Sequence, residues 1–178
     1  KRTMSSMLGV SAYLGKSDID FDVVENSKIF YIEGYMVTSD DNFSAVISVL
    51  EHLKGKGVKK ALSLSDAGIV HGFKEKFDLI ISNPPYISEN DMKILSKSVL
   101  NWEPRIALTP EGDGLGAYRH ILDGAKNLLI PNGKLILEIG YDQGRQVTHL
   151  LKNHGYKDIE LVKDINNKDR VLSASWIE

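Results

Sequence analysis

The sequence contains no cysteine, no long apolar segment and no large excess of charge of either sign. The absence of cysteine excludes disulfides, thiolate catalysis and sulfur-bound zinc, and it is typical of a cytoplasmic protein. No apolar run approaches the ~20 residues that span a bilayer, so we expect no membrane segment. The net charge of −2 offers no broad basic surface, which makes nucleic acid an unfavourable partner.

Proline is absent from the first 83 residues, and all five prolines lie in the rest of the chain. The 178 residues suit one domain, because a chain of this length can bury about 70% of its unfolded surface. The apolar fraction of 42% and the charged fraction of 26% are those of an ordinary globular protein. We therefore predict a single domain over 1–178, with a change in composition near 73–78.

Apolar segments with strand character alternate with segments of helical periodicity. The predicted strands are 28–36, 61–64, 77–82, 134–139, 157–163 and 170–176. The predicted helices are 3–14, 43–53, 90–100, 115–129 and 147–151. This alternation predicts an α/β fold, with a doubly wound, mostly parallel Rossmann-like sheet. The two closing strands predict an antiparallel C-terminal edge.

The tetrapeptide Asn83-Pro84-Pro85-Tyr86 directly follows the buried strand predicted at 77–82. In open α/β sheets, ligands bind beyond the carboxyl ends of the strands. The Asn83 side chain and the Pro84 carbonyl can accept both hydrogens of a planar –NH2 group, which directs its nitrogen lone pair towards an electrophilic methyl group. Tyr86 offers an aromatic wall for that group. The motif therefore predicts methylation of an amide or amine, driven by alignment.

The same tetrapeptide also has a simpler interpretation as a strand-to-loop turn. Asn-Pro and Pro-Pro are common turn dipeptides, and the four residues alone do not separate the two interpretations. The buried strand directly before the motif favours a functional site, because it places the turn at the ligand-binding edge of the sheet.

The strand and the motif together, FDLIISNPPYI at 77–87, resemble the core of the HemK/PrmC family, the release-factor glutamine N5-methyltransferases. Further blocks match the family in the same order along the chain. They are Glu103-Pro104 with Ala107-Leu108, Asp113-Gly114-Leu115 with Tyr118-Arg119, Leu137-Glu138-Ile139-Gly140 with Gln143, Gly155-Tyr156, and Asp169-Arg170-Val171. The resemblance covers about residues 77–178.

This resemblance implies methyl transfer from S-adenosylmethionine (SAM) to a glutamine side-chain amide of a peptide chain release factor. The catalytic residues that it implies, which would hold the amide, are Asn83 and Pro84. The residues that would shape the substrate pocket are Pro85, Tyr86, Glu103 and Pro104. Glu103-Pro104 also has a structural interpretation as a plain loop, and Glu138 as a carboxylate at a strand end.

A complete methyltransferase of this family carries a glycine-rich loop after its first strand, followed by an acidic residue for the ribose of the cofactor. The nearest candidate is LSLSDAG at 62–68, a strand followed by Asp66 and Gly68. This segment lacks repeated glycines, and Asp66 could equally cap a helix. Asp66, Gly68 and Asn83 are the residues that we assign to the cofactor.

The first half of the chain has a different resemblance. Its segments Arg2-Thr3-Met4 with Leu8-Gly9, Ile32-Glu33-Gly34-Tyr35, and Leu62-Ser63-Leu64-Ser65-Asp66 resemble the middle of a ribokinase/PfkB-type sugar kinase, closest to the adenosine-kinase-like members. The Gly-Ala-Gly-Asp segment that carries the chemistry of that family does not occur in the sequence. We therefore infer a chain that joins a kinase-like half, 1–76, to a methyltransferase-like half, 77–178.

The sequence leaves two functions to be decided between. One is SAM-dependent glutamine methyl transfer, and the other is an inactive fused α/β scaffold that lacks the cofactor loop. A PfkB-type kinase is disfavoured by the missing Gly-Ala-Gly-Asp segment. An adenine-N6 DNA methyltransferase is disfavoured by the net charge and by the blocks at 103–104 and 113–115.

Overall fold

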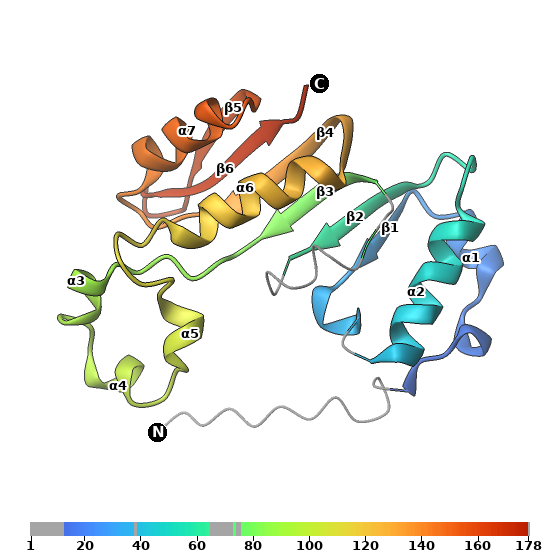
Figure 1. Ribbon diagram of the computed structural model, residues 1–178, viewed down its shortest axis with the longest axis horizontal. Coiled ribbons are helices and arrows are strands. Elements are labelled where there is room, and N and C mark those ends of the chain that lie inside the picture. Colours follow the sequence, from blue (N-terminus) through green and yellow to red (C-terminus); the bar gives the residue numbers. More distant parts are fainter. Residues whose placement is uncertain (1–12, 38, 65–72, 74–75, 178) are drawn as a thin grey trace.

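The computed structural model describes residues 13–37, 39–64, 73 and 76–177, and Figure 1 shows its arrangement. Within these residues one six-stranded sheet has the strand order β1-β2-β3-β4-β6-β5. The strands are β1 (Ile29–Ile32), β2 (Lys59–Ser63), β3 (Phe77–Ser82), β4 (Leu129–Glu138), β5 (Lys157–Lys163) and β6 (Asp169–Ser175). The pairs from β1 to β4 are parallel, and β6 is antiparallel to both of its neighbours. The predicted mostly parallel sheet with an antiparallel C-terminal edge is confirmed.

Seven α-helices lie in the described part of the chain. They are α1 (Phe21–Glu25), α2 (Asp40–His52), α3 (Glu89–Met92), α4 (Lys97–Leu100), α5 (Arg105–Leu108), α6 (Gly116–Leu128) and α7 (Gly144–Asn153). The first turn of α2 is capped by Ser39, whose hydroxyl accepts a hydrogen bond from the Asn42 amide at 3.3 Å. The long helices α2, α6 and α7 bury one apolar stripe each against the sheet.

One buried cluster joins the sheet to these three helices. On the sheet side, Ile32, Leu62, Ile80 and Leu135 lie next to one another across β1 to β4. On the helix side, the cluster includes Val46, Leu50, Tyr118, Leu122, Val147 and Leu151. Because one contiguous cluster holds residues of all three helices, α2, α6 and α7 cover the same face of the sheet (Figure 1). The second helical layer of a doubly wound sheet is not among the described residues.

The opposite face of the sheet, which we call the open face, carries Ile29, Tyr31, Leu79, Ile81 and Ile136. The strand register places Tyr31 in line with Leu79, and Ile81 beside Ile136. Ile29 and Tyr31 are 52% and 49% exposed, and the other three side chains are partly exposed. Apolar residues therefore occupy both faces of the parallel strands, but the described helices bury only one of them.

The segment between β3 and α6 forms an arm that contains α3, α4 and α5 and extends away from the sheet (Figure 1). Two backbone hydrogen bonds close its base. The Ile87 amide donates to the Leu108 carbonyl at 3.0 Å, and the Glu89 amide donates to the Gly112 carbonyl at 3.1 Å. The arm is thus attached directly behind the Asn83-Pro84-Pro85-Tyr86 turn.

Most predicted elements lie close to their predicted positions, and two differ in form. The strand predicted at 28–36 ends at Ile32, because Gly34–Val37 turns into a 3₁₀-helix in which the Met36 amide donates to the Glu33 carbonyl at 2.9 Å. The helix predicted at 90–100 is divided into α3 and α4. The helix predicted at 3–14 lies almost entirely outside the described residues.

The described helices include none that is long and apolar enough to cross a membrane. The same part of the chain also contains no cluster of three or more histidine, aspartate or glutamate side chains that could hold a metal ion.

The buried stripe of α6 provides a test of the packing. Leu122 is 0% exposed in the main cluster, so Leu122→Ala should lower the free energy of unfolding by about 2–5 kcal/mol through lost burial and the cavity it leaves. Ile165 is fully exposed at 102%, so Ile165→Ala should change the free energy of unfolding by less than about 0.5 kcal/mol. Urea unfolding of both variants checks the prediction, and equal effects would contradict the packing.

Candidate functional site

The Asn83-Pro84 turn lies at the carboxyl end of β3, a central strand between β2 and β4. The end of β3 is tied to β2, because the Leu64 amide donates to the Ile81 carbonyl at 2.8 Å and the buried Ser82 hydroxyl donates to the Leu64 carbonyl at 3.0 Å. In the turn that follows these hydrogen bonds, Asn83 is exposed and Pro84 is buried. Within the described residues the Asn83 carboxamide has no hydrogen-bond partner, which leaves it available to a ligand.

Tyr86 is held at both its ring and its hydroxyl group. The ring packs against the main cluster, and the hydroxyl donates to Glu138 Oε1 at 3.4 Å. Glu138, at the end of β4, also lies 3.9 Å from the Arg170 guanidinium, which forms a second ion pair with Asp164 at 3.2 Å. Burial, followed by the negative charge of Glu138, raises the pKa of Tyr86. The phenol therefore remains a protonated hydrogen-bond donor near neutral pH.

The backbone of Tyr86 is held by the buried side chain of Gln143, which precedes α7. Gln143 Nε2 donates to the Tyr86 carbonyl at 2.8 Å and lies 3.5 Å from the Gly114 carbonyl. Gln143 Oε1 accepts from the Gly140 amide at 3.0 Å and from the Tyr118 hydroxyl at 3.2 Å. One side chain therefore joins the turn after β3, the loop before α6 and the end of β4.

The loop before α6 approaches the turn so closely that a glycine is required. Gly114 has φ +76°, and a Cβ atom there would lie 2.6 Å from the Tyr86 carbonyl oxygen. The neighbouring Asp113 accepts from the Leu115 amide at 3.0 Å and from two guanidinium nitrogens of Arg119. The Arg119 hydrogen bond, followed by the Leu115 amide, lowers the pKa of Asp113 to about 2.

The other predicted substrate residues lie in the arm. Glu103 follows α4, and Pro104 is the residue before α5, whose first turn it starts by accepting from the Ala107 amide at 2.9 Å. The structure therefore brings Asn83, Pro84, Pro85 and Tyr86 together and places Glu103 and Pro104 on a separate element (Figure 1). The roles of all six residues stay predictions.

Asp66 and Gly68, the predicted cofactor residues, lie outside the described residues. A carboxylate that the sequence interpretation missed stands at the same edge of the sheet. Glu33 follows β1 and accepts from the Tyr31 hydroxyl at 2.5 Å and from the Ser63 hydroxyl at the end of β2 at 3.2 Å. Its position directly after a strand matches that of Asn83 after β3, but the strand predicted at 28–36 ran past Glu33 and so concealed this position.

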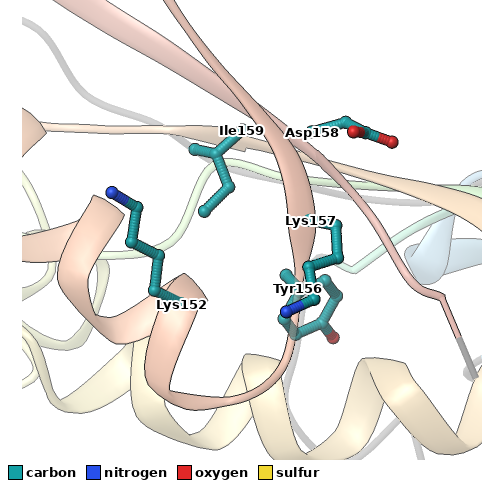
Figure 2. Close-up of a pocket in the computed structure, with 5 residues that line it drawn as sticks. All are labelled: Lys152, Tyr156, Lys157, Asp158 and Ile159. Atoms are coloured by element: carbon teal, nitrogen blue, oxygen red, sulfur yellow. The ribbon is translucent and has the colours of Figure 1, made fainter.

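A hollow of about 450 Å³ lies elsewhere on the protein, between α7 and the start of β5, and Figure 2 shows the residues that line it. Its lining residues are Lys152, Tyr156, Lys157, Asp158 and Ile159. Because β5 runs parallel to β4, this hollow lies at the amino end of the strands, opposite the Asn83 turn. It is therefore no part of the candidate site.

Two glycines of the same loop allow a matched test of the close approach. Gly114 and Gly112 both have positive φ, but a Cβ at Gly112 would meet nothing within 4 Å. Both alanine variants should lose about 1 kcal/mol to backbone strain, and Gly114→Ala should lose a further ~1–3 kcal/mol because its methyl group meets the Tyr86 carbonyl. Thermal unfolding measures the difference, and equal losses would show that the contact is loose.

The ion pair of Asp113 predicts a dependence of stability on pH. A carboxylate whose pKa is lowered on folding stabilises the protein above its unfolded pKa and loses this effect as the pH falls through its folded pKa. Wild type should therefore exceed Asp113→Asn in unfolding free energy by less than about 1 kcal/mol near neutral pH, and the difference should shrink between about pH 4 and pH 2. Urea unfolding across this range measures it. Asp142→Asn serves as the control, since Asp142 is exposed and has no ion pair in the described part of the chain.

Curated relatives support the predicted resemblance to glutamine methyltransferases. The release factor glutamine methyltransferase of Cereibacter sphaeroides is 40% identical over 138 residues, which are 78% of this chain and 50% of that protein. The chain spans half the length or less of the curated relatives it matches.

Solved structures with a similar arrangement include members of both predicted families. A protein-(glutamine-N5) methyltransferase from Alicyclobacillus acidocaldarius is 21% identical, with 84% of this chain and 80% of that chain covered and a TM-score of 0.42. An adenosine kinase from Sinorhizobium meliloti is 18% identical, with 74% and 35% covered and a TM-score of 0.43. At these TM-scores neither structure decides between the two resemblances.

A family model described as Eco57I restriction-modification methylase matches residues 14–137. This match covers more than half of the chain and runs through both predicted halves, including the Asn83-Pro84-Pro85-Tyr86 turn. On that ground the chain belongs to the Eco57I restriction-modification methylase family.

Proposed function

We propose that this chain transfers a methyl group from SAM to the side-chain amide of a glutamine in a peptide chain release factor. The observation that carries the proposal is the Asn83 carboxamide, exposed and unpartnered within the described residues at the carboxyl end of β3. Beside it, the Pro84 carbonyl and the Tyr86 ring belong to a turn held by Gln143 and Glu138. The lack of cysteine supports the cytoplasm as the compartment.

The geometry suits an –NH2 group as the methyl acceptor. A glutamine amide can donate one hydrogen to Asn83 Oδ1 and the other to the Pro84 carbonyl, which fixes its plane and leaves the nitrogen lone pair, perpendicular to that plane, open to a methyl group. SAM would supply a methyl group on a positively charged sulfur. As the N–C bond forms, the S–C bond breaks, the neutral thioether leaves with the bonding electrons, and one amide proton is released to water, so the step needs alignment more than a strong base. Tyr86 stays protonated, because its pKa is raised, and it serves as a wall rather than as a base.

The described residues offer part of what a SAM site needs. Glu33 stands at the carboxyl end of β1, two strands from Asn83, and a carboxylate at a strand end can accept hydrogen bonds from both ribose hydroxyls. Its partners include the hydroxyls of Tyr31 and Ser63, so the carboxylate accepts hydrogen bonds from hydroxyl groups in this position. Asp66 and Gly68 remain predicted cofactor residues on the segment that follows β2.

The arm supports a protein as the substrate. It exposes four large apolar side chains, Ile94, Leu100, Trp102 and Ile106, directly behind the Asn83 turn. Exposed apolar surface of this kind suits protein contact, and the net charge of −2 is unfavourable for DNA. Glu103 and Pro104 lie on the same arm, in agreement with a role in substrate binding. The name of the Cereibacter sphaeroides relative supports a release factor as that protein.

An inactive fused scaffold is the second candidate, and one observation favours it. Strands β1 to β4 lie in the sheet in their chain order, whereas dinucleotide-type sites form where the strand order reverses. The scaffold would then be the predicted joining of a kinase-like half, 1–76, to a methyltransferase-like half, 77–178. Against a joint near 73–78, the 138-residue match to the Cereibacter sphaeroides relative is longer than the segment 77–178 and so includes residues of the first half.

Calorimetry with SAM separates the two candidates. The enzyme should release or absorb heat on binding SAM, and a glutamine-containing release-factor domain should then become methylated. No binding at millimolar SAM would establish the scaffold. Methylation of adenine in DNA, with the release factor unmodified, would overturn the assignment of the substrate.

Asn83→Ala tests the residue that carries the proposal. The variant should bind SAM as wild type does but transfer methyl groups at least about 100-fold more slowly, because the amide loses its alignment. Asn153→Ala is the matched control, since Asn153 is exposed at the end of α7, and its transfer rate should equal that of wild type. Mass spectrometry of the release-factor peptide measures both rates. A transfer rate for Asn83→Ala within threefold of wild type would contradict the role of Asn83.

A further inference from the structure

The orientation of the Gln143 amide is fixed by its neighbours. The Gly140 amide can only donate, so the atom facing it must be the oxygen of Gln143. The carbonyls of Tyr86 and Gly114 can only accept, so the atom facing them must be the nitrogen. The Tyr118 hydroxyl lies 3.2 Å from the oxygen and 3.2 Å from the Glu138 carbonyl, so its single hydrogen is shared between these two acceptors. The buried side chain thus has neighbours at all four hydrogen-bonding positions, in one orientation.

The nitrogen of that amide acts on the Asn83 turn through a stiff connection. Only two residues, Pro84 and Pro85, separate Asn83 from Tyr86, and each proline ring locks its own φ. The position of the Tyr86 carbonyl therefore limits the direction of the Pro84 carbonyl, with few free rotations between them. The N–H group that Gln143 directs at Tyr86 is the polar contact that sets this position from a rigid element, the start of α7.

We propose that Gln143 is a positioning residue, which holds the Pro84 carbonyl and the Asn83 side chain in register for the amide substrate. This inference rests on the proposed methyl transfer for its functional part. Its structural part, the immobilisation of the turn by the amide nitrogen, stands without it. No substrate atom needs to contact Gln143, because its effect passes through the Tyr86 carbonyl.

Gln143→Glu tests the amide nitrogen alone, because it replaces the NH2 group by an oxygen. Glutamate has the same shape and keeps the oxygen that accepts from Gly140 and Tyr118. As a carboxylate, the new oxygen faces the carbonyls of Tyr86 and Gly114 and repels them, so the turn should detach from α7. A protonated carboxyl group could instead donate to the Tyr86 carbonyl, so Gln143→Met, which has no donor, is measured beside it. Tyr118→Phe is the matched control. It removes the hydroxyl that is shared between the oxygen of the same amide and the Glu138 carbonyl, and it leaves both contacts of the nitrogen unchanged.

Hydrogen exchange measures the structural part without any need for activity. In Gln143→Glu, the amides of Ile87 and Glu89, which close the base of the arm, should exchange at least 10-fold faster than in wild type. In Gln143→Glu, the amides of β3 should keep the exchange rates of wild type. In Tyr118→Phe, the amides of Ile87 and Glu89 should keep them as well. Gln143→Met removes the same donor without adding a charge, and it should show the same faster exchange. Unchanged exchange at Ile87 and Glu89 in Gln143→Met would overturn the proposal.

Kinetics measure the functional part. Gln143→Glu should lower kcat for the glutamine peptide by about 10–100-fold and leave the dissociation constant of SAM within threefold, while Tyr118→Phe should keep the kcat of wild type. Faster exchange with an unchanged kcat would overturn the role in catalysis. A wild-type protein without transfer would reject the proposed function, while the exchange data would still decide whether Gln143 holds the turn.

Discussion

A carboxamide buried in a protein is stable only when its two lone pairs and its two N–H groups find partners. Gln143 meets this condition with groups from three separate parts of the chain. Each such bond contributes about 1 kcal/mol net, but an unsatisfied buried partner would cost about 1–3 kcal/mol. The arrangement of the candidate site depends on these hydrogen bonds. The turn after β3, the loop before α6 and the end of β4 cannot separate without leaving buried polar groups unpaired.

The buried Gln143 amide also requires glycine at two positions near the site. A Cβ at Gly140 would lie 2.8 Å from Gln143 Oε1, and one at Gly114 would lie 3.1 Å from Gln143 Nε2. Both are distances that a side chain could not tolerate without displacing the amide. The family blocks that contain Gly114, Gly140 and Gln143 are therefore parts of one packing unit, although they are far apart in the sequence.

Local patterns were sufficient for the elements but not for their assembly. β3 matches its prediction, because a short apolar run that ends at Asn83-Pro84 favours a buried strand, and α6 was evident from its apolar stripe. The exposure of the open face among the described residues could not be predicted, since the apolar Leu79 and Ile81 indicate a strand buried on both faces. The contact of Gln143 with Tyr86 joins residues 57 positions apart, which no local pattern specifies. Within the site, the turn residues were predicted and the groups that hold them were not.

The strand order of the sheet sets the sequence in which it can be assembled as the chain leaves the ribosome. β2, β3 and β4 each join the edge left by the strand made just before, so each of them can pair once it has emerged. The last two strands break this pattern, because β6 is made after β5 but inserts between β5 and β4. The sheet therefore remains open at β4 until the C-terminal hairpin has emerged and docks as one piece.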